Sequence, residues 1–365
     1  MRVRAAIALA VNEIRVGELE LDEPRFGEVL VRLVATGICH TDLSMVRGNL
    51  PVPFPLVAGH EGAGVVEAVG PGVTDLAVGD HVICSITFAC GTCYTCVRHQ
   101  LPCELGAGVA FTGQMPDGTM RLHDDGGRDV NHIFCQSSFA THTVVPAAAA
   151  VKVREDAPLA KVAALGCGVG TGLGAVLNRA QVPPGSSVLV MGAGGVGLAA
   201  MLGARLAGAS TVIAADLNDA KLDKAKSLAA DVLVNPKSAD LGDAVDALTE
   251  GRGVDYAFDA VGADGTLETC FRATRPGGTT VAIGIMNATV SSDIDTYSLL
   301  MEKTLTGTFG GSLSPKRDIP AFVDLFMAGR LDIGALIDHE CKLDDVAQAL
   351  DGLERGEFTR AVILH

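Results

Sequence analysis

Four cysteines in one short segment could hold a metal ion. Cys90, Cys93, Cys96 and Cys103 follow the pattern C-x2-C-x2-C-x6-C, which places four soft thiolate ligands in one loop, as tetrahedral zinc requires. Because protein ligands would fill all four positions, we expect a structural site with no place for a substrate. Disulfides are the alternative interpretation, although they need an oxidising compartment and an awkward geometry between such near neighbours.

Three dispersed residues could form a second metal site. They are Cys39 in GICHTD, His60 in AGHEGAG and Cys167 in LGCGVGTG. One imidazole and two thiolates would leave a fourth position on zinc open to water or a substrate oxygen, so this site could do chemistry. Each residue taken alone could instead be an ordinary core residue, because spacing this wide does not establish that the three converge.

A glycine-rich turn could bind the phosphates of a dinucleotide. Gly192, Gly194 and Gly197 make the pattern GxGxxG directly after an expected strand and at the start of an expected helix. Such glycines allow a tight turn and a close approach of the backbone to pyrophosphate, which the helix N-terminus attracts. The predicted turn comprises Gly192, Gly194, Gly195, Val196 and Gly197. A tight turn in an ordinary α/β core is the alternative.

An acidic residue after the next strand indicates which dinucleotide would bind. The carboxylate of Asp216 could accept hydrogen bonds from ribose hydroxyls and would repel a 2′-phosphate, so NAD is favoured over NADP. Lys221 could fold back over the same ribose, or it could be an exposed lysine on the following helix.

The pattern of hydrophobic and turn-forming residues predicts a β-rich first half and an α/β second half. Up to about residue 165, short Val-rich and Ile-rich segments such as GEVLVRLVATG are punctuated by Gly, Pro and Asp, which is typical of many short strands. From Ser186, strand patterns such as SSVLVMG and STVIAAD alternate with helical ones, which predicts a parallel, doubly wound sheet. The tail from about Gly310 carries two helical patterns and the strand-like RAVILH, which we expect to return to the first domain.

Composition excludes several classes of partner. The chain has 365 residues, of which 48% are hydrophobic, so it can bury a large core. A formal charge of -15 argues against nucleic acid and anionic membranes as partners. No apolar run reaches the roughly 18 residues of a spanning helix. The opening MRVRAAIALAV imitates a signal peptide but leads into a strand pattern, so we expect a cytoplasmic protein, with export as the minor alternative.

These motifs occur in an order that resembles the zinc-dependent medium-chain alcohol dehydrogenases. The resemblance rests on residues 31–83 with GICHTD and GHEGAGVVEAVGPGV, then the four-cysteine loop, LGCGVGTGLGAV, VMGAGGVGLAAM and the Asp216 strand, and it covers essentially the whole chain. MPDGTMR and HIFCQSSFATHTVV are most similar to the branch that holds the glutathione-linked formaldehyde dehydrogenases and several aryl- and alkyl-alcohol dehydrogenases. The resemblance implies an α/β chain with a GroES-like, mostly β catalytic domain (1–168 and 310–365) and a Rossmann NAD-binding domain (169–309).

The resemblance also implies roles for residues around the dispersed metal site. Cys39, His60 and Cys167 would bind the catalytic zinc, and Glu61 would lie behind the metal or exchange as a ligand. Asp42 would orient a metal-ligating histidine. The hydroxyl of Thr41 would take the proton of the alcohol while zinc polarises it and hydride leaves for the nicotinamide.

Further positions would contact the cofactor or the substrate. His40 matches a pyrophosphate contact that is often arginine, and Arg360 matches a second one. Thr171 matches a residue near the nicotinamide. Ala260, Val261, Ile283 and Ile285 match the cofactor cleft, although the apolar ones could equally be sheet core. Leu50 and Ile86 match the substrate pocket and would favour an alkyl or aryl group, or they could be ordinary core.

Three departures from the family pattern limit these expectations. Ser44 stands where some members place a relay histidine, so the proton would leave through a ribose hydroxyl and water, or more slowly. The four-cysteine loop is one residue shorter than usual before Cys103, which leaves ligation by that residue open. The stretch from Leu43 to Gly59 lacks the carboxylates with which glutathione-linked enzymes hold the tripeptide. A glutathione adduct is therefore not the expected substrate.

The sequence leads to one main hypothesis and two alternatives. We expect an NAD-dependent zinc enzyme that oxidises primary, hydrophobic or aromatic alcohols to aldehydes and catalyses the reverse, with two zinc ions per chain. A related enzyme that keeps NAD bound and passes hydride to another acceptor is the close alternative. A non-enzymatic NAD-binding redox sensor is the third. The family forms homodimers, some of which pair into homotetramers, and the sequence does not choose between them or name the alcohol.

Overall fold

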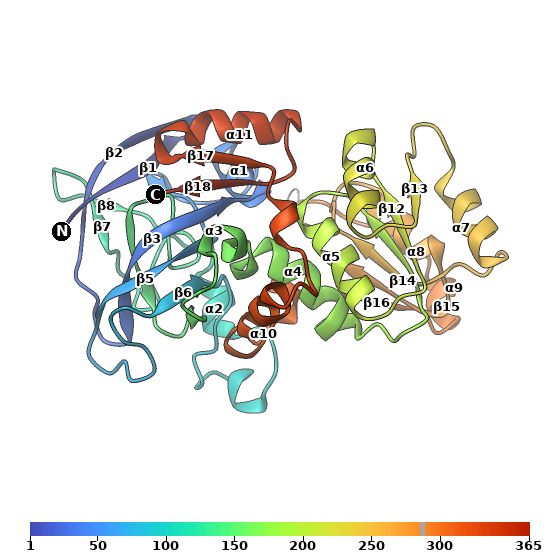
Figure 1. Ribbon diagram of the computed structural model, residues 1–365, viewed down its shortest axis with the longest axis horizontal. Coiled ribbons are helices and arrows are strands. Elements are labelled where there is room, and N and C mark those ends of the chain that lie inside the picture. The colour runs from blue at the N-terminus through green and yellow to red at the C-terminus, as the bar shows by residue number, and fades with distance from the viewer. Residues whose placement is uncertain (285–288) are drawn as a thin grey trace. The chain divides into compact units, whose positions relative to one another are not determined.

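The computed structural model describes residues 1–284 and 289–365, which form two compact units (Figure 1). The first unit contains Met1–Cys167, Ser314–Gly329 and Ile337–His365, and the second contains Gly168–Leu313 and Arg330–Leu336. Residues 330–336 belong with the second unit because they pack on its helices, and the Lys224 ammonium donates to the carbonyl of Leu336 at 3.0 Å. The domain ranges that the sequence suggests, with all of 310–365 in the first domain, stay a prediction.

Two mostly antiparallel sheets build the first unit. The first sheet has the strand order β4-β1-β2-β7-β8 and comprises β1 (Arg2–Ala10), β2 (Glu13–Leu21), β4 (Leu56–Val57), β7 (Leu122–His123) and β8 (Asp129–Val130). The second has the order β10-β6-β5-β3-β18-β17, with β9 also paired to β3; it comprises β3 (Glu28–Ile38), β5 (Gly62–Val69), β6 (His81–Cys84), β9 (His142–Pro146), β10 (Ala150–Lys152), β17 (His339–Lys342) and β18 (Ala361–Leu364). The C-terminal strand does return to this unit, because β18 pairs antiparallel with β3.

Short helices and one longer pair complete the first unit. They are α1 (His40–Val46), α2 (Glu104–Val109), α3 (Leu159–Val162), α10 (Pro315–Met327) and α11 (Val346–Arg355). The buried face of α11 consists of Val346, Ala349, Leu350 and Leu353, which repeat at helical spacing and join the same core as strand β1. Strands and helices therefore supply the core together, and the loops between them are free to carry side chains with other roles.

The second unit is a doubly wound parallel sheet. Its strands are β11 (Ser187–Met191), β12 (Thr211–Ala215), β13 (Val232–Val234), β14 (Val254–Asp259), β15 (Thr274–Ala282) and β16 (Thr304–Gly307). Their order is β13-β12-β11-β14-β15-β16, and every pair is parallel. Numbered from β11, this is the order 3-2-1-4-5-6 of dinucleotide-binding folds, so the expected α/β architecture is confirmed.

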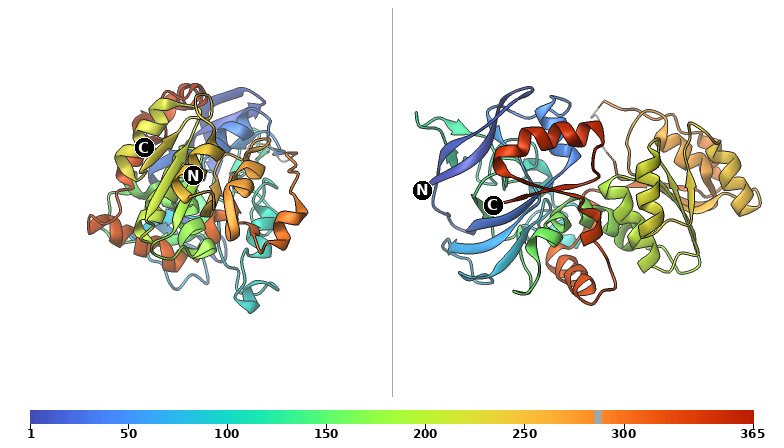
Figure 2. Two further views of the ribbon diagram at one scale, coloured as in Figure 1. Left: turned by 90° about the vertical axis from the view of Figure 1, so that its right-hand side faces the viewer. Right: turned by 45° about the horizontal axis from the view of Figure 1, so that its top comes forward.

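Helices cover both faces of this parallel sheet (Figures 1 and 2). They are α4 (Gly168–Gly174), α5 (Gly195–Leu206), α6 (Asp219–Leu228), α7 (Leu241–Thr249), α8 (Thr266–Ala273) and the short α9 (Thr296–Leu300).

Within the described residues no single helix has the length and apolar character to cross a bilayer, although Leu159–Gly166 and Gly168–Ala180 meet that criterion when they are taken together as a bent pair.

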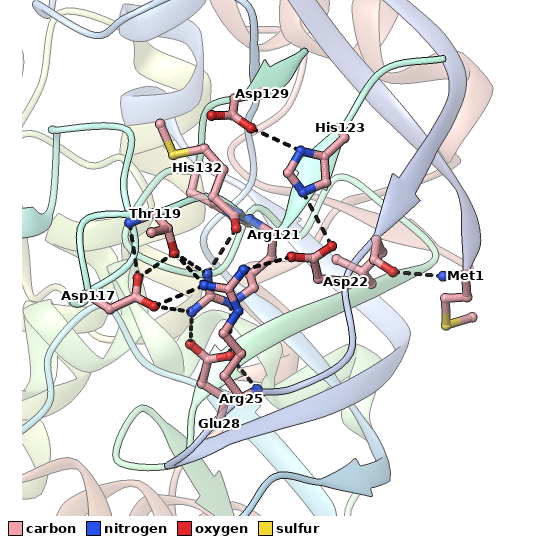
Figure 3. Close-up of polar contacts among 12 residues, drawn as sticks. Met1, Asp22, Arg25, Glu28, Asp117, Thr119, Arg121, His123, Asp129 and His132 are labelled. Carbon is pink, nitrogen blue, oxygen red and sulfur yellow. Dashed lines mark hydrogen bonds and ion pairs between the residues drawn. The ribbon is translucent and has the colours of Figure 1, made fainter. Parts of the chain in front are cut away.

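A buried ion network fixes the path of the segment between Glu104 and Ser138 (Figure 3). The Arg121 side chain is fully buried, and its guanidinium donates to both oxygens of Glu28, at 2.9 and 2.6 Å. The same guanidinium donates to Asp117 at 2.7 Å. Glu28 begins β3, so this network ties the segment to the second sheet of the first unit. Bidentate pairing of this kind is among the strongest polar contacts in proteins.

Candidate active site and metal centres

The four-cysteine loop brings all four sulfurs together. Their Sγ atoms all lie within 4.8 Å of one another, and the Cys90–Cys96 and Cys93–Cys103 separations are both 3.9 Å. A zinc–sulfur bond of about 2.3 Å implies sulfur–sulfur distances of about 3.8 Å around a tetrahedron. None of the ten cysteines, all in described parts of the chain, forms a disulfide. The shortened loop therefore still presents Cys103 as the fourth ligand.

Local hydrogen bonds prepare these sulfurs for a metal. The amide of Cys93 donates to Cys90 Sγ at 3.3 Å, and the amide of Gly106 donates to Cys103 Sγ at 3.4 Å. Hydrogen bonds from the Thr95 hydroxyl and the Cys96 backbone lower the pKa of the Cys93 thiol to about 5. Because zinc binds thiolates, donors directed at sulfur favour the state that the metal needs.

The dispersed metal site also assembles, from loops at the ends of strands. Cys39 follows β3 and caps α1, while His60 and Glu61 lie between β4 and β5. Cys167 ends a short turn after α3. One ligand atom from each of these four residues lies within 4.8 Å of the others, and all four side chains are buried. The spacing of these residues left their convergence open and only the resemblance implied it; the structure brings them together.

The histidine of this cluster has a nitrogen that needs a partner. His60 Nδ1 lies 2.9 Å from Oδ1 of buried Asp42, so the ring is held at that side. Its Nε2 atom is buried and has no hydrogen-bond partner among the described residues. Buried polar atoms in folded proteins nearly always have a partner, so this nitrogen is expected to bind a further group. Two thiols, a carboxylate and this nitrogen are the donor types that zinc prefers, so the residues fit a zinc ion.

The charges inside the cluster are strongly coupled. A hydrogen bond from Cys167 lowers the pKa of the Cys39 thiol well below its usual value, while the same contact and burial raise the pKa of Cys167. Burial alone would lower the pKa of His60, but Asp42 and Cys39 outweigh it and raise that pKa. A buried thiolate is thus already favoured where a metal cation would neutralise it.

Glu61 reaches the cluster through a space that only glycine leaves open. A Cβ atom on Gly37 would lie 2.0 Å from Glu61 Oε2, so a larger residue in this part of β3 would displace the carboxylate. The same oxygen accepts a hydrogen bond from the buried guanidinium of Arg360. Arg360 was expected to contact pyrophosphate; its pairing with Glu61 has no local sequence signal, because the two residues are 299 positions apart.

The remaining predicted residues of the first unit lie near Cys39 or in the core. Thr41 places its hydroxyl 3.7 Å from Cys39 Sγ, and exposed His40 begins α1. Ser44 is half-buried in the same helix. Leu50 and Ile86 are both buried apolar side chains, and their place in a substrate pocket stays a prediction.

The three glycines of the GxGxxG turn, Gly192, Gly194 and Gly197, are explained by different physical requirements. Gly192 adopts φ +93°, which side chains rarely tolerate. A Cβ on Gly197 would lie 1.8 Å from the Gly192 carbonyl oxygen, so this glycine permits close packing of α5 on the turn. A Cβ on Gly194 would meet nothing within 4 Å, so the protein itself does not require glycine there. Close approach of a pyrophosphate would require it.

Residues around this turn lie at the carboxyl ends of neighbouring parallel strands, where dinucleotides bind in such folds. Asp216 follows β12, and its carboxylate accepts hydrogen bonds from the amides of Ala193 and Asn218 at 2.8 and 2.9 Å. Lys221 lies in the first turn of α6. The other predicted positions are Ala260 and Val261 after β14, Ile283 after β15, Thr171 in α4, and Ile285, which is outside the described residues.

Two residues near the dispersed cluster were not predicted. The Phe134 ring lies 5.0 Å from the His60 imidazole, centroid to centroid. The Gln136 side chain bonds the backbone on both sides of Glu61. Both occur in HIFCQSSFATHTVV, but neither type of residue signals a metal site.

Comparisons with known proteins agree with this geometry. Residues 25–155 match the model of the alcohol dehydrogenase GroES-like domain, and residues 195–328 match that of the zinc-binding dehydrogenases. The chain is 38% identical to an S-(hydroxymethyl)glutathione dehydrogenase of Paracoccus denitrificans, with 100% of each chain covered. It is 36% identical to alcohol dehydrogenase 1 of Pisum sativum, covering 100% of this chain and 97% of that one.

A solved structure is similar over the same length. Benzyl alcohol dehydrogenase from Acinetobacter calcoaceticus superposes with a TM-score of 0.94 at 36% identity, covering 100% of this chain and 99% of that one. The two donor clusters are accordingly a structural zinc site with four cysteines and a catalytic zinc site that contains cysteine, histidine and glutamate. The chain belongs to the zinc-dependent medium-chain alcohol dehydrogenases.

Proposed function

We propose that this zinc-dependent alcohol dehydrogenase oxidises primary, hydrophobic or aromatic alcohols to aldehydes, and catalyses the reverse, with NAD as the hydride carrier. The observation that carries the proposal is the buried cluster of Cys39, His60, Glu61 and Cys167, in which His60 Nε2 lacks a protein partner among the described residues. Zinc, when bound there, supplies a Lewis acid that makes an alcohol hydroxyl easier to deprotonate.

The chain's own residues would hold the metal and move the proton. Asp42 keeps His60 Nδ1 occupied, so that Nε2 is the nitrogen directed at the ion. The Thr41 hydroxyl, beside Cys39, would accept the proton of the substrate. Ser44, three residues further along α1, stands in place of a relay histidine, so the proton would leave through a ribose hydroxyl of the cofactor and water, or more slowly. These roles are part of the proposal.

Cofactor choice would be made in the second unit. Asp216 is half-buried beside the glycine-rich turn, where its carboxylate would accept hydrogen bonds from ribose hydroxyls and repel a 2′-phosphate. Arg360 has a buried Nε–H without a partner among the described residues. We propose that a phosphate oxygen of the cofactor accepts a hydrogen bond from this Nε–H.

Apolar residues and a carboxylate-free stretch of sequence between two of the metal ligands support an apolar substrate. Leu50 and Ile86 are apolar and buried, and the stretch from Leu43 to Gly59 has no carboxylate to bind a charged peptide. Similarity to a benzyl alcohol dehydrogenase supports an aromatic alcohol, whereas similarity to an S-(hydroxymethyl)glutathione dehydrogenase supports the thiol adduct as the second candidate.

A substrate panel tests the proposal. Formation of NADH would be measured with benzyl alcohol, hexanol, ethanol and S-(hydroxymethyl)glutathione, and we expect the highest kcat/KM for the first two. Cys39→Ser should abolish activity, while Cys270→Ala, a buried cysteine outside both clusters, should leave it unchanged. A preference for the glutathione adduct would refute the substrate class. NAD that stays bound through gel filtration, with turnover only after an artificial acceptor is added, would favour the enzyme with resident cofactor.

We further propose a homodimer that forms through the edge of the parallel sheet. Strand β16 is an edge strand, and the adjacent segment exposes large apolar side chains: Tyr297 is 70% exposed and Leu300 is 77% exposed. Edge strands pair readily, and a two-fold axis would let two copies of β16 pair with each other. Light scattering should give twice the chain mass of 37.5 kDa, with Leu300→Asp weakening the dimer; a tetramer would require a second interface.

A cytoplasmic location completes the proposal, supported by ten cysteines without a disulfide.

A further inference from the structure

The loop from Ile133 to Ser138, which contacts His60 of the catalytic cluster, is held in an unusual backbone conformation. Phe134, Cys135 and Ser137 all have positive φ, between 49° and 58°, although none of them is glycine. Side-chain residues avoid this region, and they keep it only where surrounding contacts impose it. One such contact is the Ser137 hydroxyl, which accepts from the amide of Ile133 at 3.1 Å.

This conformation places the Gln136 side chain against the segment just before β5, which carries the metal ligands His60 and Glu61. Gln136 is 1% exposed. Its Nε2 atom donates to the carbonyl of His60 at 3.0 Å, and its Oε1 atom accepts from the amide of Gly62 at 3.3 Å. A single side-chain amide thus satisfies one buried acceptor and one buried donor, on either side of Glu61.

The backbone of Glu61 is also held on its opposite edge. Its carbonyl oxygen accepts from the amide of Gly37 in β3, at 3.1 Å. The peptide units around Glu61 are therefore fixed by β3 on one side and by Gln136 on the other. Because the His60 and Glu61 side chains leave this backbone in succession, its position decides whether both reach the same point.

We propose that Gln136 is a positioning residue of the catalytic metal site, which keeps His60 and Glu61 converged on one ion. A side-chain amide carries an NH2 donor and a carbonyl acceptor in one plane, so Gln136 can donate to His60 and accept from Gly62 at the same time. The Phe134 ring, in the same loop, packs beside the imidazole, with the two ring planes inclined by 41°. The loop thus supports the site without contributing a ligand.

Metal affinity tests this role directly, with the structural site as an internal reference. Zinc loss would be followed by titrating the enzyme with a chelator and measuring how much metal remains on the protein. Gln136→Met keeps the volume but loses both hydrogen bonds, so we expect affinity for the catalytic zinc to fall about 10- to 100-fold, as when groups that orient metal ligands are removed. Affinity for the zinc of the four-cysteine site should not change.

A second variant gives a signature that packing alone would not produce. In Gln136→Glu, a protonated carboxyl can donate to His60 and accept from Gly62, whereas the ionised form cannot donate. Burial should raise the pKa of this glutamate. The ratio of its catalytic zinc affinity to that of the parent should therefore rise toward one as the pH falls from about 9 to 6.

Ser137→Ala is the matched control, because it removes a hydrogen bond within the same loop and leaves the Gln136 amide in place. It should lower thermal stability without changing zinc affinity. If both Gln136 variants keep the catalytic zinc within twofold of the parent and behave as Ser137→Ala does, the inference is wrong. The inference rests on the proposed function only for its link to turnover. If the Gln136 variants bind the catalytic zinc more weakly but the parent enzyme oxidises no alcohol, the proposed function is overturned and the role of Gln136 stands.

Discussion

Replacing Asp42 with asparagine should loosen the catalytic zinc more than it destabilises the fold. The buried Asp42 carboxylate accepts three hydrogen bonds: Oδ1 from the Gly59 amide at 2.9 Å and from His60 Nδ1 at 2.9 Å, and Oδ2 from the Cys39 amide at 3.0 Å. An asparagine has one acceptor oxygen and one NH2 group. Whichever way it turns, its NH2 group faces at least one N–H donor.

The cost can be estimated from these contacts. The less harmful orientation turns the NH2 group toward Cys39 and leaves one buried amide without an acceptor, which costs about 1–3 kcal/mol. His60 keeps a hydrogen bond, but the bond is no longer to a charged group and weakens by about 1 kcal/mol. Because Cys39 and His60 are both ligands, much of this loss should appear as weaker metal binding. A 10- to 100-fold fall in zinc affinity corresponds to about 1.4–2.7 kcal/mol.

Two measurements on Asp42→Asn separate these effects. Chelator titration should show the catalytic zinc weakened by that factor and the zinc of the four-cysteine site unchanged, while denaturant unfolding of the zinc-free protein reports the loss of stability. Asp259→Asn is the matched control: Asp259 is 2% exposed and also caps two backbone amides, those of Val261 and Gly262, but it contacts no zinc ligand. If Asp42→Asn lowers stability as Asp259→Asn does and leaves zinc affinity within twofold, Asp42 does not orient His60.

Four further outcomes are expected. Cys93→Ser should lower the unfolding temperature before it lowers specific activity, because it opens the four-cysteine site; a fully stable variant would contradict a structural zinc. Glu28→Gln should lower the free energy of unfolding by about 3 kcal/mol, the lower end for a broken buried pair, since Asp117 still neutralises Arg121. Asp216→Gly should narrow the preference for NAD over NADP in kcat/KM, and unchanged discrimination would mean that another group makes the choice. Burial lowers the pKa of His132 from 6.5 to about 3, so its neutral form stabilises the fold above pH 6.5 and this contribution is lost as the pH falls toward 3; His132→Gln should flatten the decline of unfolding temperature across that range.

The fold and the ligand sets were predictable because their signals are local or chemically narrow. The strand and helix periods of the second half and the GxGxxG turn lie within short windows, and the parallel order β13-β12-β11-β14-β15-β16 agrees with them. The four-cysteine spacing needs no knowledge of the rest of the chain. The dispersed ligands Cys39, His60 and Cys167 could be proposed because few residue types bind zinc, although only the resemblance to a family gave a reason to group them.

The path between Glu104 and Ser138 could not be predicted, because long-range pairs set it. Arg121 meets Glu28 across 93 positions, and a lone buried arginine in a polar loop has no periodic pattern that would reveal its partner. The same holds for Gln136, which reaches His60 across 76 positions. Hydrogen bonds between a side chain and a distant backbone leave no trace in composition or spacing.

This difference follows from what each contact demands of chemistry. A zinc ligand must be a thiolate, an imidazole or a carboxylate, so the metal restricts the residue type and the sequence exposes it. A group that holds the ligand's backbone has only to donate or accept at the right place, and any polar residue brought there by the fold can serve. His60 illustrates both cases: Asp42 orients its ring from 18 positions away, and Gln136 fixes its carbonyl from the far side. Substitutions at supporting positions should therefore vary in residue type among active relatives while the two hydrogen bonds persist, and a relative with an apolar residue in place of Gln136 should need another donor to the His60 carbonyl.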